Sequence, residues 1–329
     1  MARTIPQLAA GIVCCLAQLA CGSIDEPPQD RQSREQFAAS LLRSFRSRVS
    51  LHWSIAISSD GARLASATGD GFLQLWDVSS GDRLREVSAH SGGAFSIAFS
   101  PDSKRLASGG RDPFIRFWDV ENGKEISPPL RHGNLAITAL AFNSEGTLLA
   151  SGSTNGTIQV WDVSQGKETA KLFEFSDYVT SIAFDPKSEF LASGSYDQKG
   201  ILWDLAAAAK VRAVKGAKGR MEVKFTSDGD CYCAAVEHGQ VGMWNLSRGE
   251  RLPVTAMPDS QAAMTLAWAP NYLIGGGEKG AVWIWSSQNG KLVRTLDSQG
   301  EAITAVTYGS GSRLLAAASP GEVMVWRIE

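Results

Sequence analysis

The chain has 329 residues, of which 43% are hydrophobic and 20% are charged, with 33 glycines and 12 prolines. This composition excludes a disordered chain, because it supplies apolar side chains for a large core and glycines for many tight turns. The 32 basic and 34 acidic residues give a net charge of -2 with no long block of one sign, so a nucleic-acid partner, which calls for a basic face, is not expected.

Residues 1–22 are predicted to be an export leader. Arg3 provides a short positive start, and residues 8–20 form an apolar run of the length found in secretory signals. This run is too short to span a bilayer as a stable helix. Export to the periplasm or to a membrane surface is therefore expected, with a cytoplasmic location as the alternative.

The end of the leader reads Gln-Leu-Ala-Cys-Gly-Ser and resembles a bacterial lipobox. The resemblance implies that Cys21 is lipidated and anchors the protein to a membrane. Gln18 and Leu19 depart from the lipobox pattern, so simple cleavage after Gly22 is the alternative.

Residues 23–40 form a polar segment with two prolines and are predicted to be a linker ahead of the folded domain. Within that domain, Cys231 and Cys233 are two residues apart in a strand-like run. Their side chains share one face, but strand geometry disfavours a bridge between them, and they are interpreted as small buried hydrophobic residues.

A repeat of about 41 to 43 residues runs through residues 41–329. Seven of the ten tryptophans share one register: Trp76, Trp118, Trp161, Trp203, Trp244, Trp285 and Trp326. A period of this length with a Trp-Asp pair is typical of propeller blades. Each unit also predicts four short strands separated by turns, as in the second unit, where strands are expected at 94–100, 105–110 and 114–120, with a fourth beginning near Lys124.

Four of the seven tryptophans are followed by aspartate, at Asp77, Asp119, Asp162 and Asp204, and here the sequence resembles the WD40 repeat family. The resemblance covers residues 41–329. It implies an all-β, seven-bladed WD40-type β-propeller, in which each blade buries its faces against its neighbours around a ring. We expect it to be monomeric.

The ring is predicted to close through its N-terminal strand. The last unit ends at its third strand, and the repeat register places Leu41–Phe45 where a fourth strand is missing. Pairing there would cover an exposed sheet edge. A short helix with Phe37, Leu41 and Phe45 on one face is the alternative for this segment.

The WD40 resemblance also implies hydrogen-bonded tetrads of His, Ser or Thr, Asp and Trp inside the blades, which would satisfy buried polar groups. The second unit has the whole set and the others have only parts of it, with Arg48 at the histidine position of the first unit. The residues of the first four units are Ser66, Asp70 and Trp76; His90, Ser108, Asp112 and Trp118; His132, Ser151, Asn155 and Trp161; and Ser193, Asp197 and Trp203.

These Ser, His and Asp residues are interpreted as structural because their spacing follows the tryptophan from blade to blade. The sequence contains no zinc-protease, nucleophile-elbow or phosphate-loop motif and no spaced set of metal ligands. No catalytic residue, metal or cofactor is therefore predicted.

The leading functional hypothesis is a non-catalytic scaffold that binds a peptide or protein partner. The resemblance implies binding at the end of the ring formed by the loops before strand one and between strands two and three. Aromatic, methionine and arginine side chains there suit a protein interface. The candidate residues are Trp53, Phe95, Arg111, Tyr196, Met221, Glu237, Met264 and Glu278.

Two other functions remain open. An enzymatic or ligand-sensing propeller would need charged side chains that converge on the innermost strands, and these strands are largely apolar or small. A purely structural spacer in an envelope would have no selective partner. The apolar residues of the loop end also have an alternative role, because many of them could pack between blades instead of facing a partner.

Overall fold

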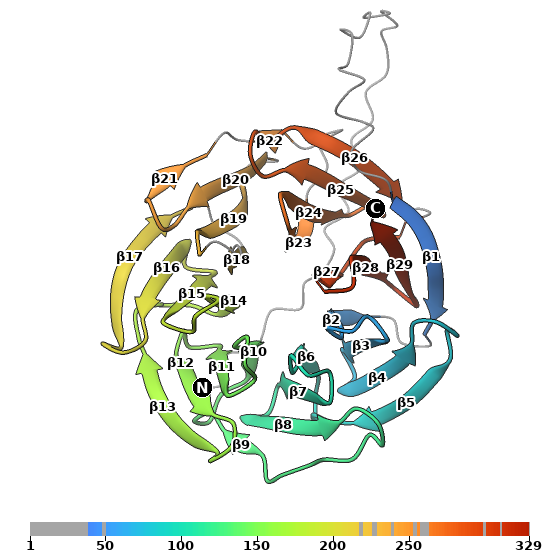
Figure 1. The fold of residues 1–329 in the computed structure, drawn as a ribbon, viewed down its shortest axis with the longest axis horizontal. Coiled ribbons are helices and arrows are strands. Elements are labelled where there is room, and N and C mark those ends of the chain that lie inside the picture. The colour runs from blue at the N-terminus through green and yellow to red at the C-terminus, as the bar shows by residue number, and fades with distance from the viewer. Residues whose placement is uncertain are drawn as a thin grey trace, which may run out of the picture.

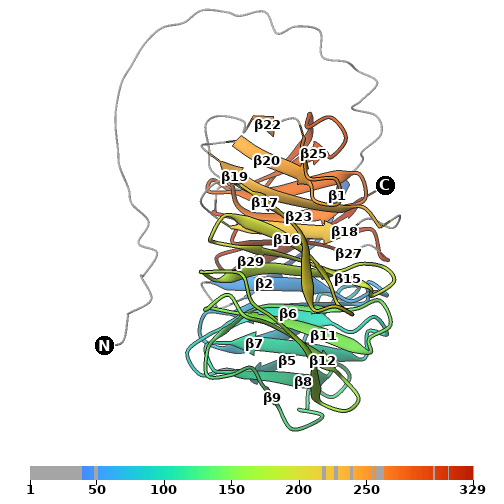
Figure 2. The same ribbon diagram turned by 90° about the vertical axis from the view of Figure 1, so that its left-hand side faces the viewer.

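A computed structural model describes residues 39–47, 51–216, 220–225, 229–237, 240–252, 255–256, 263–298, 301–309 and 311–328. The elements in these ranges are β-strands, and they form seven sheets that stand as blades around a central axis (Figure 1). Figure 2 shows the same ring turned by 90°, with strands of successive blades lying one above another. The leader, Cys21 and the linker as far as residue 38 lie outside the described residues, so lipidation and export stay predictions.

Each blade is an antiparallel sheet whose strands follow one another outward from the axis. Blade 1 contains β2 (His52–Ile57), β3 (Arg63–Thr68), β4 (Phe72–Asp77) and β5 (Arg83–Ser88). Blade 2 contains β6 (Ala94–Phe99), β7 (Arg105–Gly110), β8 (Phe114–Asp119) and β9 (Leu130–Arg131). Blade 3 contains β10 (Ile137–Phe142), β11 (Leu148–Ser153), β12 (Ile158–Asp162) and β13 (Lys167–Leu172).

The remaining blades repeat this order. Blade 4 contains β14 (Val179–Phe184), β15 (Phe190–Ser195), β16 (Lys199–Asp204) and β17 (Ala209–Lys215). Blade 5 contains β18 (Met221–Phe225), β19 (Cys231–Glu237), β20 (Gln240–Asn245), β21 (Glu250–Arg251) and β22 (Thr255–Ala256). Blade 6 contains β23 (Ala263–Ala269), β24 (Tyr272–Gly277), β25 (Ala281–Ser286) and β26 (Leu292–Asp297). Blade 7 contains β27 (Ala305–Gly309), β28 (Leu314–Ser319), β29 (Glu322–Ile328) and β1 (Ala39–Arg46).

The outer strand of blade 2 differs from the prediction that it begins near Lys124. After β8 the chain makes only an isolated bridge between Trp118 and Glu125, and the short β9 then pairs with the start of β8. Pro128 and Pro129 lie between these two contacts. Proline has no N–H to donate to a neighbouring strand, which explains why a continuous fourth strand does not form here.

The hydrophobic core is divided among the gaps between neighbouring blades. One cluster joins Val323 and Val325 of blade 7 to Ile55 and Leu64 of blade 1, and another joins Leu202 of blade 4 to residues of blade 5. All seven tryptophans of the repeat are buried. The tryptophan register therefore marks the packing between blades, which is why it recurs once per blade.

The ring closes where β1 pairs with β29, as the repeat register predicted (Figure 1). Leu41 lies opposite Trp326 and Phe45 lies opposite Val323. The Phe45 ring is buried against Trp76 of blade 1, with centroids 6.0 Å apart. The alternative of a helix over this segment is wrong, because main-chain pairing with the open edge of β29 and burial of Phe45 both require an extended chain.

Blade 2 contains the complete polar tetrad. Nδ1 of His90 lies 3.0 Å from Oδ1 of Asp112, and Nε2 of His90 lies 2.8 Å from Oγ of Ser108. Nε1 of Trp118 donates to the same Oγ at 2.8 Å. Ser108 therefore serves two buried nitrogens at once, so this blade holds its buried polar groups through one hydroxyl.

In blade 1 a different histidine contacts the tetrad serine. The predicted histidine substitute, Arg48, lies outside the described residues, and Nδ1 of His52, from β2 itself, lies 3.1 Å from Oγ of Ser66. Asp70 accepts a hydrogen bond from the Thr68 hydroxyl at 2.6 Å. His52 precedes its serine by 14 residues whereas His90 precedes its serine by 18, so alignment by spacing does not find it.

Blade 4 keeps only one end of the chain of hydrogen bonds. Nε1 of Trp203 donates to Oγ of Ser193 at 2.7 Å. Asp197 instead pairs with the Lys199 ammonium at 3.1 Å and accepts a hydrogen bond from the Ser176 main chain at 3.0 Å. The aspartate thus holds the turn before β16 without a histidine.

A Ser108→Ala variant should lose more stability than a Ser193→Ala variant. The first change leaves two buried nitrogens, on His90 and Trp118, without a partner, whereas the second leaves only that of Trp203. At about 1–3 kcal/mol for each unsatisfied buried group, we expect the difference in free energy of unfolding to be of this size. Urea unfolding of both variants measures it, and equal losses would show that the tetrad is not cooperative.

Candidate functional site

The two sets of loops predicted to form a binding face do meet at one end of the ring. In four consecutive blades, an N–H in the turn after strand two donates to a carbonyl just before strand one, at 2.9 to 3.1 Å. The pairs are Gly69 with Leu51, Arg111 with Gly93, Thr154 with Ala136, and Tyr196 with Tyr178. This repeated hydrogen bond places Arg111 and Tyr196 beside the starts of the innermost strands. We call this end of the ring the loop face.

Aromatic side chains occupy two parts of the loop face. Trp53 of blade 1 and Phe95 of blade 2 meet edge to face, with centroids 6.0 Å apart, and both are partly exposed. In blade 4, Tyr178 and Tyr196 make a similar contact at 6.1 Å. Tyr196 is 40% exposed. Edge-to-face packing holds these rings in place while leaving part of each ring accessible.

Two exposed hydrophobic residues of the loop face were not among the predicted contacts. Leu135 is 40% exposed just before β10, and Phe173 is 63% exposed after β13, where Lys171 Nζ lies 5.3 Å from its ring centroid. Their signal in the sequence was a single large apolar residue in a polar inter-blade loop. Because such loops vary in length, aligning the repeats on their tryptophans does not place these two residues at equivalent positions.

The prediction of Met221 as a partner contact is wrong. Its side chain is fully buried in the cluster between blades 4 and 5, and its carbonyl accepts a hydrogen bond from the Thr180 hydroxyl at 2.6 Å. Glu278 is exposed in the turn after β24. The side chains of Glu237 and Met264 lie outside what the structure describes.

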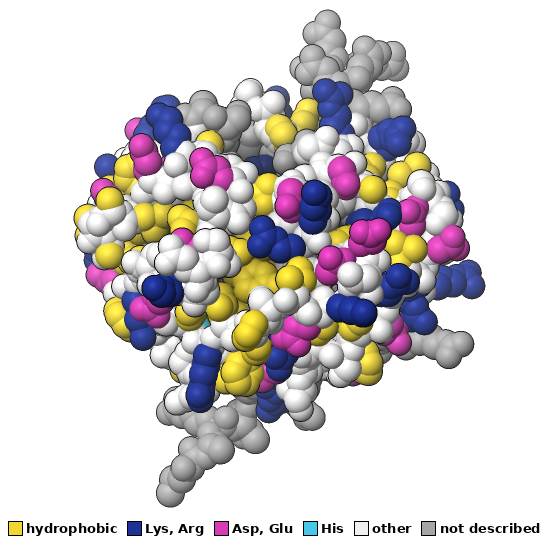
Figure 3. Space-filling model, turned by 60° about the horizontal axis from the view of Figure 1, so that its bottom comes forward, with side chains coloured by type: hydrophobic (Ala, Val, Ile, Leu, Met, Phe, Trp, Pro, Cys, Tyr) yellow, Lys and Arg dark blue, Asp and Glu magenta, His cyan; other side chains and the backbone are white. Residues whose placement is uncertain are grey.

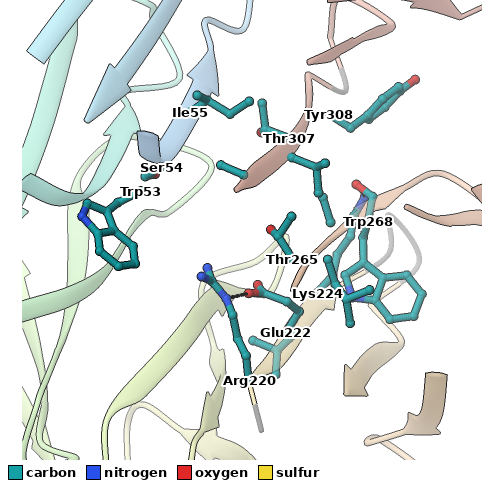
Figure 4. Close-up of a pocket in the computed structure, with 15 residues that line it drawn as sticks. Trp53, Ser54, Ile55, Arg220, Glu222, Lys224, Thr265, Trp268, Thr307 and Tyr308 are labelled. Carbon is teal, nitrogen blue, oxygen red and sulfur yellow. Dashed lines mark hydrogen bonds and ion pairs between the residues drawn. The ribbon is translucent and has the colours of Figure 1, made fainter. Parts of the chain in front are cut away.

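The central channel contains a cavity of about 230 Å³ bordered by the innermost strands of blades 1, 5, 6 and 7 (Figure 4). Arg220, Glu222 and Lys224 line it from one strand and the residue before it, because alternate positions of a strand share a face. The innermost strands were expected to be largely apolar or small, and blade 5 departs from this expectation. The charges come from blade 5 alone.

The electrostatics of these three groups are unequal. Arg220 Nε donates to a carboxylate oxygen of Glu222 at 2.5 Å, and Glu222 raises the pKa of Arg220. Lys224 Nζ donates to the Trp268 main-chain oxygen at 3.2 Å, and burial lowers the pKa of Lys224 to about 8. The lysine therefore lies in a partly desolvated position without a carboxylate partner among the described residues.

The surface view gives no strong field of one sign. Figure 3 shows Lys, Arg, Asp and Glu side chains interspersed over one face of the ring, with hydrophobic side chains gathered in a hollow near its centre.

Cys231 and Cys233 are buried and unbridged, as interpreted from the sequence. Among the described residues, no three His, Cys, Asp or Glu side chains are grouped to hold a metal, and no helix is long and apolar enough to cross a membrane.

Comparison with known proteins supports the fold. The family model described as the IFT122 first beta-propeller matches residues 51–327 of the chain. No protein of curated function matches the sequence. The matched region begins just before β2 and ends within β29, so it spans all seven blades.

Proposed function

Since the chain belongs to the IFT122 first beta-propeller family, we propose that it is a non-catalytic platform that holds a peptide or protein partner on the loop face. Propellers of this kind commonly mediate interactions between proteins. A fold alone does not specify function, so the proposal rests on the side chains of the loop face.

The observation that carries the proposal is the set of exposed, locally fixed side chains on that face. Tyr196 is 40% exposed and braced by Tyr178, and Arg111 is exposed in the equivalent turn of blade 2. Tyrosine, tryptophan and arginine dominate the binding energy of protein interfaces. A rigid ring also loses little conformational entropy when it binds a partner. Phe95 of blade 2 contacts Trp53, which extends this surface to blade 1.

A photo-crosslinking amino acid at position 196 tests the proposal in cells of the source organism. We expect one discrete crosslinked product, because a selective partner would cover this residue. Leu292 is the matched control, since it is 43% exposed but lies on the outer strand β26. Adding Trp53→Ala and Arg111→Ala should weaken the product from position 196. The same products from both positions, or none from position 196, would instead favour a spacer without a selective partner.

A further inference from the structure

The proposed function does not account for the charged side chains of the central channel. We propose that this channel is a binding site for a small carboxylate, with Lys224 as its main ligand and Arg220 at its entrance. This site goes beyond the proposed function. Trp53 borders both the cavity and the loop face, but the carboxylate would be held by the charged and hydroxyl side chains of the cavity.

The first support is the balance of charge in the cavity. Of the residues that line it, Arg220 and Lys224 are cationic and Glu222 is the single carboxylate. The Glu222 carboxylate accepts a hydrogen bond from Nε of Arg220, so its negative charge is paired with Arg220 at the entrance of the channel. The cavity therefore has an excess of one positive charge and suits an anion.

The second support is the incomplete set of partners around Lys224. An ammonium group has three donors, and the single hydrogen bond of Nζ to the described part of the chain goes to the Trp268 carbonyl. Nζ is in no ion pair with a described residue, and its lowered pKa comes from burial alone. Burying a charge without a counterion is costly, so a bound carboxylate would offset a cost that the folded protein already bears.

The third support is the lining of the rest of the cavity. Ser54, Thr265 and Thr307 add hydroxyl groups from three other blades, and Figure 4 shows them around the charged wall. Hydroxyl groups donate readily to carboxylate oxygens. Residues 220 and 224 are four positions apart, or about 13 Å along an extended strand, so Arg220 lies nearer the loop face and Lys224 deeper.

The volume limits the size of the ligand. Sites for drug-sized ligands measure about 300–1,000 Å³, whereas this cavity measures about 230 Å³. It suits a small organic acid, or the side chain of an aspartate or glutamate from another polypeptide. Both sources present the same carboxylate, and the experiment below separates them.

Isothermal titration calorimetry of the full chain with glutarate and with the peptide acetyl-Gly-Glu-Gly-amide tests the site, with neutral glutaramide as the control. We expect binding of glutarate that Lys224→Met weakens at least about tenfold, as for loss of one hydrogen bond to a charged group. Lys210→Met is the matched control, since that lysine lies on the outer strand β17, and it should leave the affinity unchanged. Binding of the peptide alone, with the same loss in Lys224→Met, would assign the carboxylate to a polypeptide.

A second variant keeps the test decisive if Lys224→Met folds poorly. Glu222→Gln removes the resident negative charge and frees Arg220, so it should tighten the binding of glutarate several-fold. The proposal is overturned if neither carboxylate binds, if Lys224→Met binds as tightly as the unaltered chain, or if Glu222→Gln binds more weakly. Circular dichroism of each variant confirms that the ring is folded.

Discussion

Phe45→Ala should lower the free energy of unfolding by about 3–5 kcal/mol, the usual cost of removing a fully buried phenylalanine. Phe45 is only 2% exposed and packs in the cluster that joins blade 7 to blade 1. It also contacts Trp76 across the closure, so its loss affects two blades at once. Because β1 supplies the strand that completes blade 7, weakening it should promote opening of the ring at this one seam.

Leu41→Ala is the matched control for this change. Leu41 lies on the same strand but is 59% exposed, so its truncation should alter stability by less than about 0.5 kcal/mol. Urea unfolding followed by tryptophan fluorescence measures both variants, and limited proteolysis locates the opened segment. If the two variants lost equal stability, the pairing of main chains and not the burial of Phe45 would hold the seam closed.

Acidification from pH 7 to pH 5 should destabilise the fold through its buried histidines. Burial lowers the pKa of His52 and of His132 to about 4, against 6.5 for an exposed histidine. Between these values the unfolded chain binds more protons than the folded chain, so stability falls as the pH falls. The contribution is complete above pH 6.5 and is lost toward pH 4. We expect a loss of about 2 kcal/mol for each of these histidines between pH 7 and pH 5.

The geometry explains why these rings remain neutral. Nδ1 of His132 lies 2.7 Å from Oγ of Ser151, and Nδ1 of His52 lies 3.1 Å from Oγ of Ser66. Nε2 of each ring is buried without a protein partner in the described part of the chain. A proton on Nε2 would therefore have nothing to donate to. His90 differs, because Asp112 opposes the effect of burial on its pKa, which is nevertheless lowered.

A His132→Asn variant separates this effect from other titrations. Asparagine places a polar atom near the Nδ1 position but does not titrate, so the variant should lose roughly half of the pH dependence contributed by His52 and His132. Urea midpoints at pH 7 and pH 5 give the comparison. Hydrogen bonds from Ser79 and Ser80 lower the pKa of Asp77 to about 2, so its titration falls below this window. A pH dependence unchanged in the variant would contradict a neutral, buried His132.

The repeating part of the fold was predictable from the sequence. Trp76 and its six equivalents recur once per blade because each blade must bury one large ring against its neighbour, so local pattern and global packing coincide. The same register predicted that Leu41–Phe45 pairs with the last blade, since an open edge has only one missing strand to fill.

Only the tertiary structure decided the roles of residues that interrupt the repeat. Alternation in β18 separates Met221 from Lys224, but it does not say which face meets blade 4 and which meets the channel. The structure buries Met221 between blades and turns Lys224 toward the axis. The contact between His52 and Ser66 also depends on packing, because the spacing of the repeat does not predict it. The chain pattern determines which side chains lie together on a strand, whereas the neighbours that those side chains meet depend on how the blades pack around the ring.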